Sequence, residues 1–223
     1  MNILFFDIDG TLVNTGGAGK DAMVMAVLRQ SGRDDVPADL LVAGRSDRGI
    51  AKELFERNGL DDTQENWDEF VDHYVRRLSE NLPRRNGRVL SGVRTLIESL
   101  HRGDDNVLGL ITGNLQASAQ LKLKYFGLWE YFRFGGYGDH HVDRNNIARD
   151  AMAAARVHLD GTYDPSRVWV VGDTPKDVQC ARAIGAHAIA VATGVYSVEE
   201  LSPFEPDLLL EDLSDMRPLL EML

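Results

Sequence analysis

Residues 2–11 read NILFFDIDGT, a short apolar run at 2–6 followed by the motif DIDGT at 7–11, which contains two aspartates, a glycine and a threonine. Such a run is typical of a strand that is covered on both faces, as in a parallel sheet. Side chains two positions apart on a strand share a face, so Asp7 and Asp9 are expected to project together from its carboxyl end. Open α/β sheets bind ligands at that edge. Taken alone, the stretch is equally compatible with a strand-ending turn at Gly10.

Similar apolar runs recur along the chain with helical patterns between them, which predicts an α/β protein with a Rossmann-like parallel sheet core. The further candidate strands are residues 107–111, 168–171, 187–191 and 207–210, with a weaker one at 132–136.

The interval from residue 14 to residue 83 contains no convincing strand and instead has amphipathic segments at 20–31, 47–58 and 64–81. We therefore expect two domains: a core formed by residues 1–13 and 84–223, and a helical insert formed by residues 14–83. Ser91 is expected to cap the first helix after the return to the core. The stretch GGAGKD at 16–21 departs from a P-loop at both ends and is expected to be a hinge into the insert.

Composition limits the function classes. The chain has 223 residues, with 24 Lys and Arg against 35 Asp and Glu, a formal net charge of −11. This acidity argues against binding of nucleic acid. The single cysteine, Cys180, excludes an internal disulfide and a Cys-rich zinc site. No apolar run is long enough for a membrane span, so we expect a soluble, cytoplasmic protein.

A second acidic motif, GDTPKD, follows the candidate strand at 168–171 and places Asp173 at a strand end, with Asp177 one helical turn later. If the two strands are neighbours, three or four carboxylates converge. Two like charges about 4 Å apart repel by about 4 kcal/mol at an effective dielectric near 20. We therefore expect a bound cation, and ligands that are all oxygens suit Mg²⁺.

The third motif is ITGN at 111–114, an apolar strand end followed by a hydroxyl residue and a glycine. Thr112, Gly113 and Asn114 could cradle phosphate oxygens together with free N–H groups at a helix start. Read alone, the motif fits a helix N-cap better.

Together, these three ordered motifs resemble the haloacid dehalogenase superfamily of phosphohydrolases, with the helical insert in the place of that family's helical (C1-type) cap. The resemblance covers essentially the whole chain and is nearest to the branch of phosphoglycolate phosphatase and β-phosphoglucomutase. It implies an Mg²⁺-dependent phosphatase that acts on a small phosphorylated metabolite. The presence of Asp9 favours a phosphatase or mutase over a dehalogenase.

The resemblance also implies residue roles. Asp7 would be the nucleophile that forms an aspartyl-phosphate, and Asp9 the general acid and base. The Asp7 carboxylate, the Asp9 backbone carbonyl and Asp173 would hold the metal, with Asp177 close by as an orienting residue. Thr112 would bind a phosphoryl oxygen.

One departure concerns a lysine that the family places at a helix start between the Thr element and the GD-x3-D motif, where this chain reads GDHHVDRNNIARDA at 138–151. No lysine occurs there, and Arg144 is expected to supply the charge and to bind phosphate. Lys122 and Lys124 are rivals, but a rise of 1.5 Å per residue places Lys122 about 12 Å from the sheet edge.

Arg45 in AGRSDRG is the candidate specificity residue, with Ser46 as a helix cap; an exposed arginine without a role is an equal alternative. The leading alternative function is a catalytically impaired relative that binds a ligand or partner, because the lysine is missing. A phosphomutase of the same fold and, less well, a receiver-type signalling domain are the others. We expect a monomer or a homodimer.

Overall fold

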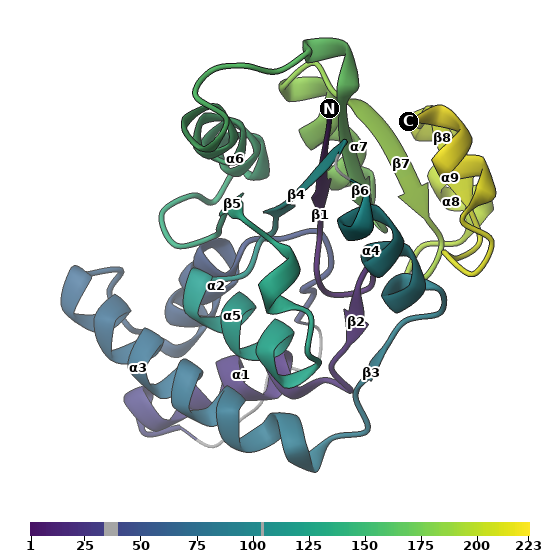
Figure 1. Ribbon diagram of the computed structural model, residues 1–223. Helices are drawn as coiled ribbons and strands as arrows, with labels where there is room; N and C mark the ends of the chain where they lie inside the picture. Colours follow the sequence, from purple (N-terminus) through teal and green to yellow (C-terminus); the bar gives the residue numbers. More distant parts are fainter. Residues whose placement is uncertain (34–39, 104) are drawn as a thin grey trace.

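The computed structural model describes residues 1–33, 40–103 and 105–223. Within these ranges, six parallel strands form one sheet in the order β5-β4-β1-β6-β7-β8 (Figure 1). This confirms the predicted α/β class. The strands are β1 (Asn2–Phe6), β4 (Asn106–Ile111), β5 (Phe134–Gly136), β6 (Val168–Gly172), β7 (His187–Val191) and β8 (Leu208–Leu210).

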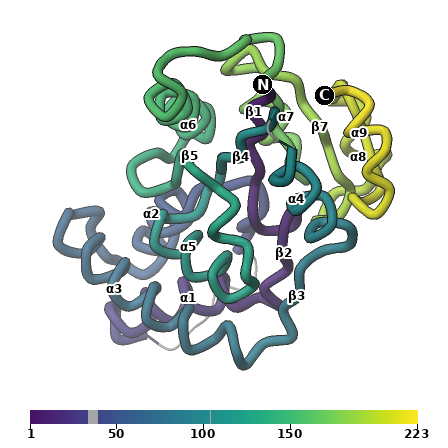
Figure 2. Tube along the Cα trace, in the orientation of Figure 1, coloured from purple at the N-terminus to yellow at the C-terminus, as the bar shows by residue number. Residues whose placement is uncertain are grey.

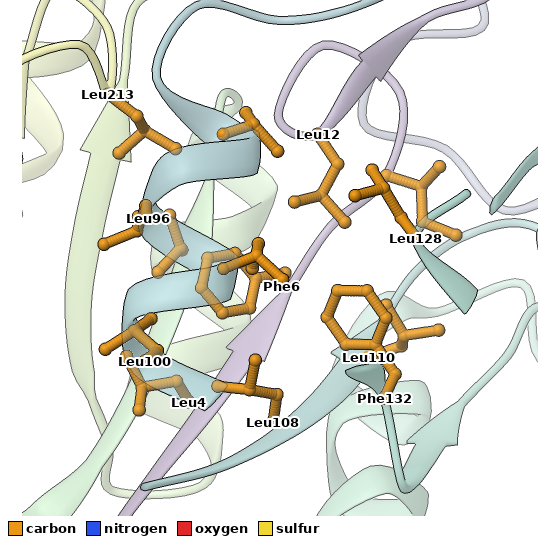
Figure 3. Close-up of a cluster of buried hydrophobic side chains, with 14 of the residues drawn as sticks. Leu4, Phe6, Leu12, Leu96, Leu100, Leu108, Leu110, Leu128, Phe132 and Leu213 are labelled. Carbon is orange, nitrogen blue, oxygen red and sulfur yellow. The ribbon is translucent and has the colours of Figure 1, made fainter. Parts of the chain in front are cut away.

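Helices cover both faces of this sheet, which is why its strands are almost wholly apolar. Side chains of β1 alternate between two buried clusters: Leu4 and Phe6 enter one, and Ile3 and Phe5 enter the other. Figure 3 shows the first cluster, in which Phe6 lies beside Leu96. The helices of that face are α4 (Val93–Arg102), α5 (Gln116–Tyr125) and α9 (Arg217–Met222); those of the other are α6 (Arg144–His158), α7 (Pro175–Ala183) and α8 (Val198–Leu201).

A helical segment lies beyond the carboxyl ends of the strands, at the bottom of Figures 1 and 2. It has its own buried cluster, in which Trp67, Phe70 and Tyr74 stack along one helix. Its helices are α1 (Ala18–Ser31), α2 (Asp47–Asn58) and α3 (Gln64–Asn81).

The chain enters and leaves this segment through two short strands that pair antiparallel, β2 (Val13–Asn14) and β3 (Arg88–Val89). The sequence did not predict this pair. Four 3₁₀ turns complete the described elements: Leu82–Arg84, Trp129–Tyr131, Pro165–Arg167 and Ser202–Phe204.

One predicted helix cap is wrong. Ser91 does not cap α4, because the cap residue is Gly92, which has a φ of 75° and makes no side-chain cap bond. A side chain at Gly92 would clash with the Leu213 carbonyl, so the chain turns at the glycine. The stretch expected to be a hinge at 16–21 is already helical from Ala18.

In the part of the chain that the structure describes, no helix is both long and apolar enough to cross a membrane.

Candidate active site

The carboxyl ends of three adjacent strands open into one cavity of about 370 Å³. β1 lies between β4 and β6 and leads into Asp7, while β6 leads into Asp173. Because parallel strands end at the same edge, motifs that are far apart in the sequence meet here. The helical segment forms the facing wall, to which it contributes Lys20, Met23, Arg45, Asp47, Ile50 and Tyr74.

Three buried carboxylates lie together at this edge. Asp7, Asp173 and Asp177 each offer an oxygen within 4.8 Å of the others. Burial raises the pKa of Asp7 to about 6, although Arg144 acts against the shift. Burial also raises the pKa of Asp173 well above its ordinary value. Oxygen donors whose charges repel one another fit a hard divalent cation, so these residues fit a metal site.

The turn after β1 brings Asp173 against Thr11, whose Oγ1 donates a hydrogen bond to Asp173 Oδ1 at 2.8 Å. Gly10 in this turn has a φ of 86°, and a Cβ there would clash with the Asp173 carboxylate. Both the backbone conformation and the close approach therefore require glycine.

Arg144 lies inside the acidic cluster. One guanidinium nitrogen lies 2.6 Å from Asp177 Oδ1 and 3.5 Å from Asp7 Oδ1. Burial alone would lower the pKa of Arg144, but the Asp177 and Asp7 carboxylates raise it above its ordinary value, so the residue stays charged. It is the first residue of α6, and Asp143 caps the helix by accepting a bond from the Asn145 N–H.

Asp177 is held from its other side by the start of α7. Its Oδ2 accepts hydrogen bonds from the Thr174 N–H at 3.0 Å and from Thr174 Oγ1 at 2.7 Å, as in a capping box. Both Asp177 oxygens are thus engaged, one by Thr174 and one by Arg144. This arrangement suits a residue that orients Arg144 beside a metal site.

The Asp9 carboxylate is bound by a different group of residues. Its Oδ2 accepts hydrogen bonds from Asn114 Nδ2 at 2.9 Å and from Lys122 Nζ at 2.6 Å. Thr112 Oγ1 accepts a further bond from the same Asn114 amide at 2.8 Å, and Thr112 is fully buried. Asn114 and Gly113 are among the cavity-lining residues, whereas Thr112 is not.

The structure contradicts the exclusion of Lys122. The separation of about 12 Å runs along the helix axis, but a helical side chain extends back toward the helix N-terminus. Lys122 Nζ consequently lies 2.5 Å from Asn114 Oδ1, and the side chain is buried. The sequence held one signal: Lys122 is four positions after Ser118 and three after Ala119, both buried on α5. Lys124 is exposed.

Arg45, the candidate specificity residue, lines the cavity, but its guanidinium is already engaged. It donates to Glu53 Oε2 at 2.5 Å and to the carbonyls of Leu41 at 3.0 Å and Gly49 at 3.1 Å. Ser46 caps α2, as predicted, by accepting a bond from the Gly49 N–H at 3.2 Å.

Asp47, which the sequence analysis did not single out, joins the helical segment to the core. Its carboxylate accepts hydrogen bonds from the Leu115 N–H at 2.8 Å and from Ser118 Oγ at 3.1 Å, and its own N–H donates to the Gly113 carbonyl at 2.6 Å. Burial raises the pKa of Asp47 to about 6, although Lys122 acts against the shift. An acidic residue in the first turn of a helix is common, so nothing in the sequence marked this contact.

Comparison with known proteins agrees with this geometry. The sequence model of the family described as haloacid dehalogenase-like hydrolase matches residues 4–191. The protein named "Probable phosphatase IndB" of Dickeya dadantii is 28% identical over 96% of this chain and 91% of its own length. A phosphoglycolate phosphatase of Synechococcus elongatus is 27% identical over 97% of this chain and 95% of its own. CbbY of Rhodobacter sphaeroides, solved in complex with phosphate, has the same fold: the TM-score is 0.77 at 18% identity, covering 97% of this chain and 96% of that one.

Proposed function

Because the chain belongs to the haloacid dehalogenase-like hydrolase family, we propose that it is an Mg²⁺-dependent phosphatase that hydrolyses a small phosphorylated metabolite through an aspartyl-phosphate. The observation that carries the proposal is the placement of Asp7. Its carboxylate lies in a buried cluster with Asp173 and beside Arg144, and both it and Asp9 line one cavity. Relatives over nearly the whole chain are named as phosphatases.

In this mechanism an Asp7 oxygen attacks phosphorus, and the bond from phosphorus to the leaving oxygen breaks. The electron pair of that bond goes to the leaving oxygen, which takes a proton from Asp9. Asp9 then removes a proton from water, which attacks the aspartyl-phosphate and releases inorganic phosphate and free Asp7.

Other residues would bind and orient the reacting groups. Asp7, Asp173 and the Asp9 carbonyl would hold Mg²⁺, which when bound offsets the negative charge between nucleophile and phosphate. Arg144, held by Asp177, would fix Asp7 and contribute positive charge on the same side. Gly113 and Asn114 would contact phosphoryl oxygens from the other side, with Thr112 supporting Asn114.

Residues 14–83 would act as a cap that excludes bulk water once the substrate has entered. The contacts of Asp47 with Leu115 and Ser118 support this role, because they would hold such a cap against the core. A cavity of about 370 Å³ accommodates a small metabolite. Arg45 lines the cavity and is the cap residue that we assign to substrate choice, with Glu53 and the carbonyls of Leu41 and Gly49 holding its guanidinium in position.

The test is release of inorganic phosphate from a panel of phosphorylated sugars, acids and nucleoside monophosphates, with Mg²⁺ or with EDTA. Asp7→Asn is the matched variant, because it keeps the shape of the side chain but removes the nucleophile. We expect release that requires Mg²⁺ and is lost in Asp7→Asn.

Two outcomes would contradict the proposal. Absence of release from every ester by a folded protein that binds Mg²⁺ would indicate a binding protein. Movement of phosphate to another carbon of the same substrate would indicate a mutase.

A further inference from the structure

Lys122 is a buried lysine whose ammonium group reaches the candidate active site from α5. Its side chain is 4% exposed, and Nζ lies 2.6 Å from Asp9 Oδ2 and 2.5 Å from Asn114 Oδ1. Lysines are almost never fully buried unless they are paired. Removing an ammonium group from water costs free energy that an ion pair often fails to recover. An apolar side chain would therefore serve the packing of α5 better, which suggests a role beyond stability.

Arg144 does not contact Asp9 in place of Lys122, because its ion pairs are with Asp177 at 2.6 Å and Asp7 at 3.5 Å. The two buried cations thus have separate partners. Arg144 serves the side of the proposed nucleophile, and Lys122 serves the side of Asp9.

The contacts distinguish the two oxygens of Asp9. Oδ2 accepts bonds from both Lys122 and Asn114, whereas Oδ1 accepts none from the described residues. The Asp9 side chain is 41% exposed and lines the cavity. Oδ1 is therefore the oxygen that a ligand can reach.

The ammonium group is also confined from the side of the helical segment. A Cβ on Gly19 of α1 would lie 3.2 Å from Lys122 Nζ. The backbone of α1 therefore passes close to Lys122 and leaves Nζ little freedom to move away from Asp9.

We propose that Lys122 is a positioning residue for Asp9. Together with Asn114 it fixes Oδ2, directs Oδ1 at the leaving oxygen of the phosphate ester, and stabilises the carboxylate that remains when Asp9 has given up its proton. This inference rests on the proposed function. As Asp7 bonds to phosphorus, the proton passes from Asp9 Oδ1 to the leaving oxygen, and Lys122 keeps all three of its protons. A charge fixed before the reaction stabilises the transition state without reorganisation.

The test compares two esters that need different amounts of proton donation: p-nitrophenyl phosphate, whose leaving group is a stable anion, and an alkyl phosphate that the wild-type protein hydrolyses. The measured quantity is kcat/KM, which reports the step that breaks the ester bond. General acid catalysis contributes about 10²–10⁴-fold. We expect Lys122→Met to lower kcat/KM for the alkyl ester by about 10–100-fold and for the aryl ester by less than about 3-fold.

Three further variants sharpen the result. Lys122→Met in an Asp9→Asn background should cause no further loss, because both changes act through Asp9. Lys122→Arg keeps the charge and should recover part of the alkyl activity. Lys124→Met removes an exposed lysine from the same helix and should leave both esters unchanged.

An equal loss on both esters, or an additive loss in the double variant, would overturn the inference, since Lys122 would then bind the phosphoryl group or act only in packing. Circular dichroism checks folding; if Lys122→Met does not fold, the ratio of the two esters in Lys122→Arg decides, and a uniform loss overturns the inference. If the wild-type protein releases no phosphate from any ester, the proposed function fails and the inference with it. That result is seen before any Lys122 variant is made.

Discussion

We predict that Asp47→Asn makes the protein more stable at neutral pH. The pKa of the buried Asp47 rises from 3.8 to about 6 in the folded protein. Each pKa unit corresponds to about 1.4 kcal/mol, so the buried carboxylate costs about 3 kcal/mol above pH 6. Asparagine keeps an oxygen that can accept the bonds from Leu115 and Ser118. The free energy of unfolding should therefore rise by up to about 3 kcal/mol.

The sign of the pH dependence follows from the direction of the shift. A carboxyl group whose pKa is raised on folding binds more protons in the folded state, so stability falls as pH rises from about 4 to about 6. Other buried carboxyl groups contribute the same trend to both proteins, and the difference between wild type and Asp47→Asn isolates Asp47.

Urea unfolding at several pH values between 4 and 8 measures this difference. We expect it to be small at pH 4 and to reach its full size above pH 6. Asp72→Asn, at an exposed position on α3, is the matched control and should change little. A variant that is less stable than wild type at pH 8, or a difference that does not vary with pH, would refute the reasoning.

Three further predictions concern the acidic cluster. Mg²⁺ at 100 times its Kd should add about 2.7 kcal/mol to the free energy of unfolding, seen as a higher Tm by calorimetry, and Asp173→Asn should remove the effect; an equal rise in that variant would place the metal elsewhere. Arg144→Lys should lower the free energy of unfolding by about 1–3 kcal/mol, because the shorter lysine side chain would not bring a charged nitrogen as close to Asp177 and Asp7; unchanged urea unfolding would contradict this. Gly10→Ala should weaken Mg²⁺ binding at least about tenfold in titration calorimetry, since its Cβ would displace the Asp173 carboxylate and its φ is 86°; wild-type affinity would argue against that contact.

The sheet could be predicted because strands that are buried on both faces leave a plain signal. Residues 2–6 and 187–191 were predicted with the bounds that the structure gives, and so were the helices 47–58 and 64–81. The ends of those helices carry local information, since Ser46 and Thr63 accept capping bonds from the backbone within their first turns.

Features that depend on tertiary contacts were not predictable in the same way. The pair β2 and β3 has two residues in each strand and no periodicity, and it forms where the chain enters and leaves the helical segment. The start of α4 depends on the approach of Leu213 to Gly92, which no local pattern encodes. Short elements of this kind depend on contacts with the rest of the fold, so the local sequence pattern does not predict them.

The acidic half of the candidate site was accessible from sequence because its carboxylates follow strands, and strand ends meet at a known edge. Lys122 and Asp47 come from helices, where a charged residue usually indicates a face in water. The packing of α5 against the helical segment brings Lys122 from one side and Asp47 from the other to the cavity. Their positions depend on how α5 and the helical segment pack together, and the sequence pattern does not show this packing.

The bond between Asp47 and the Leu115 N–H also makes one amide a reporter of motion. Asp47 belongs to α2, and Leu115 precedes the first turn of α5, so any movement that lifts the helical segment from the sheet edge must break this bond. The rate at which the Leu115 amide hydrogen exchanges with solvent deuterium therefore reports how often such openings occur. Amides inside β1, by contrast, exchange only when the sheet itself comes apart. A substrate that holds the segment in place would slow the first rate and leave the second unchanged.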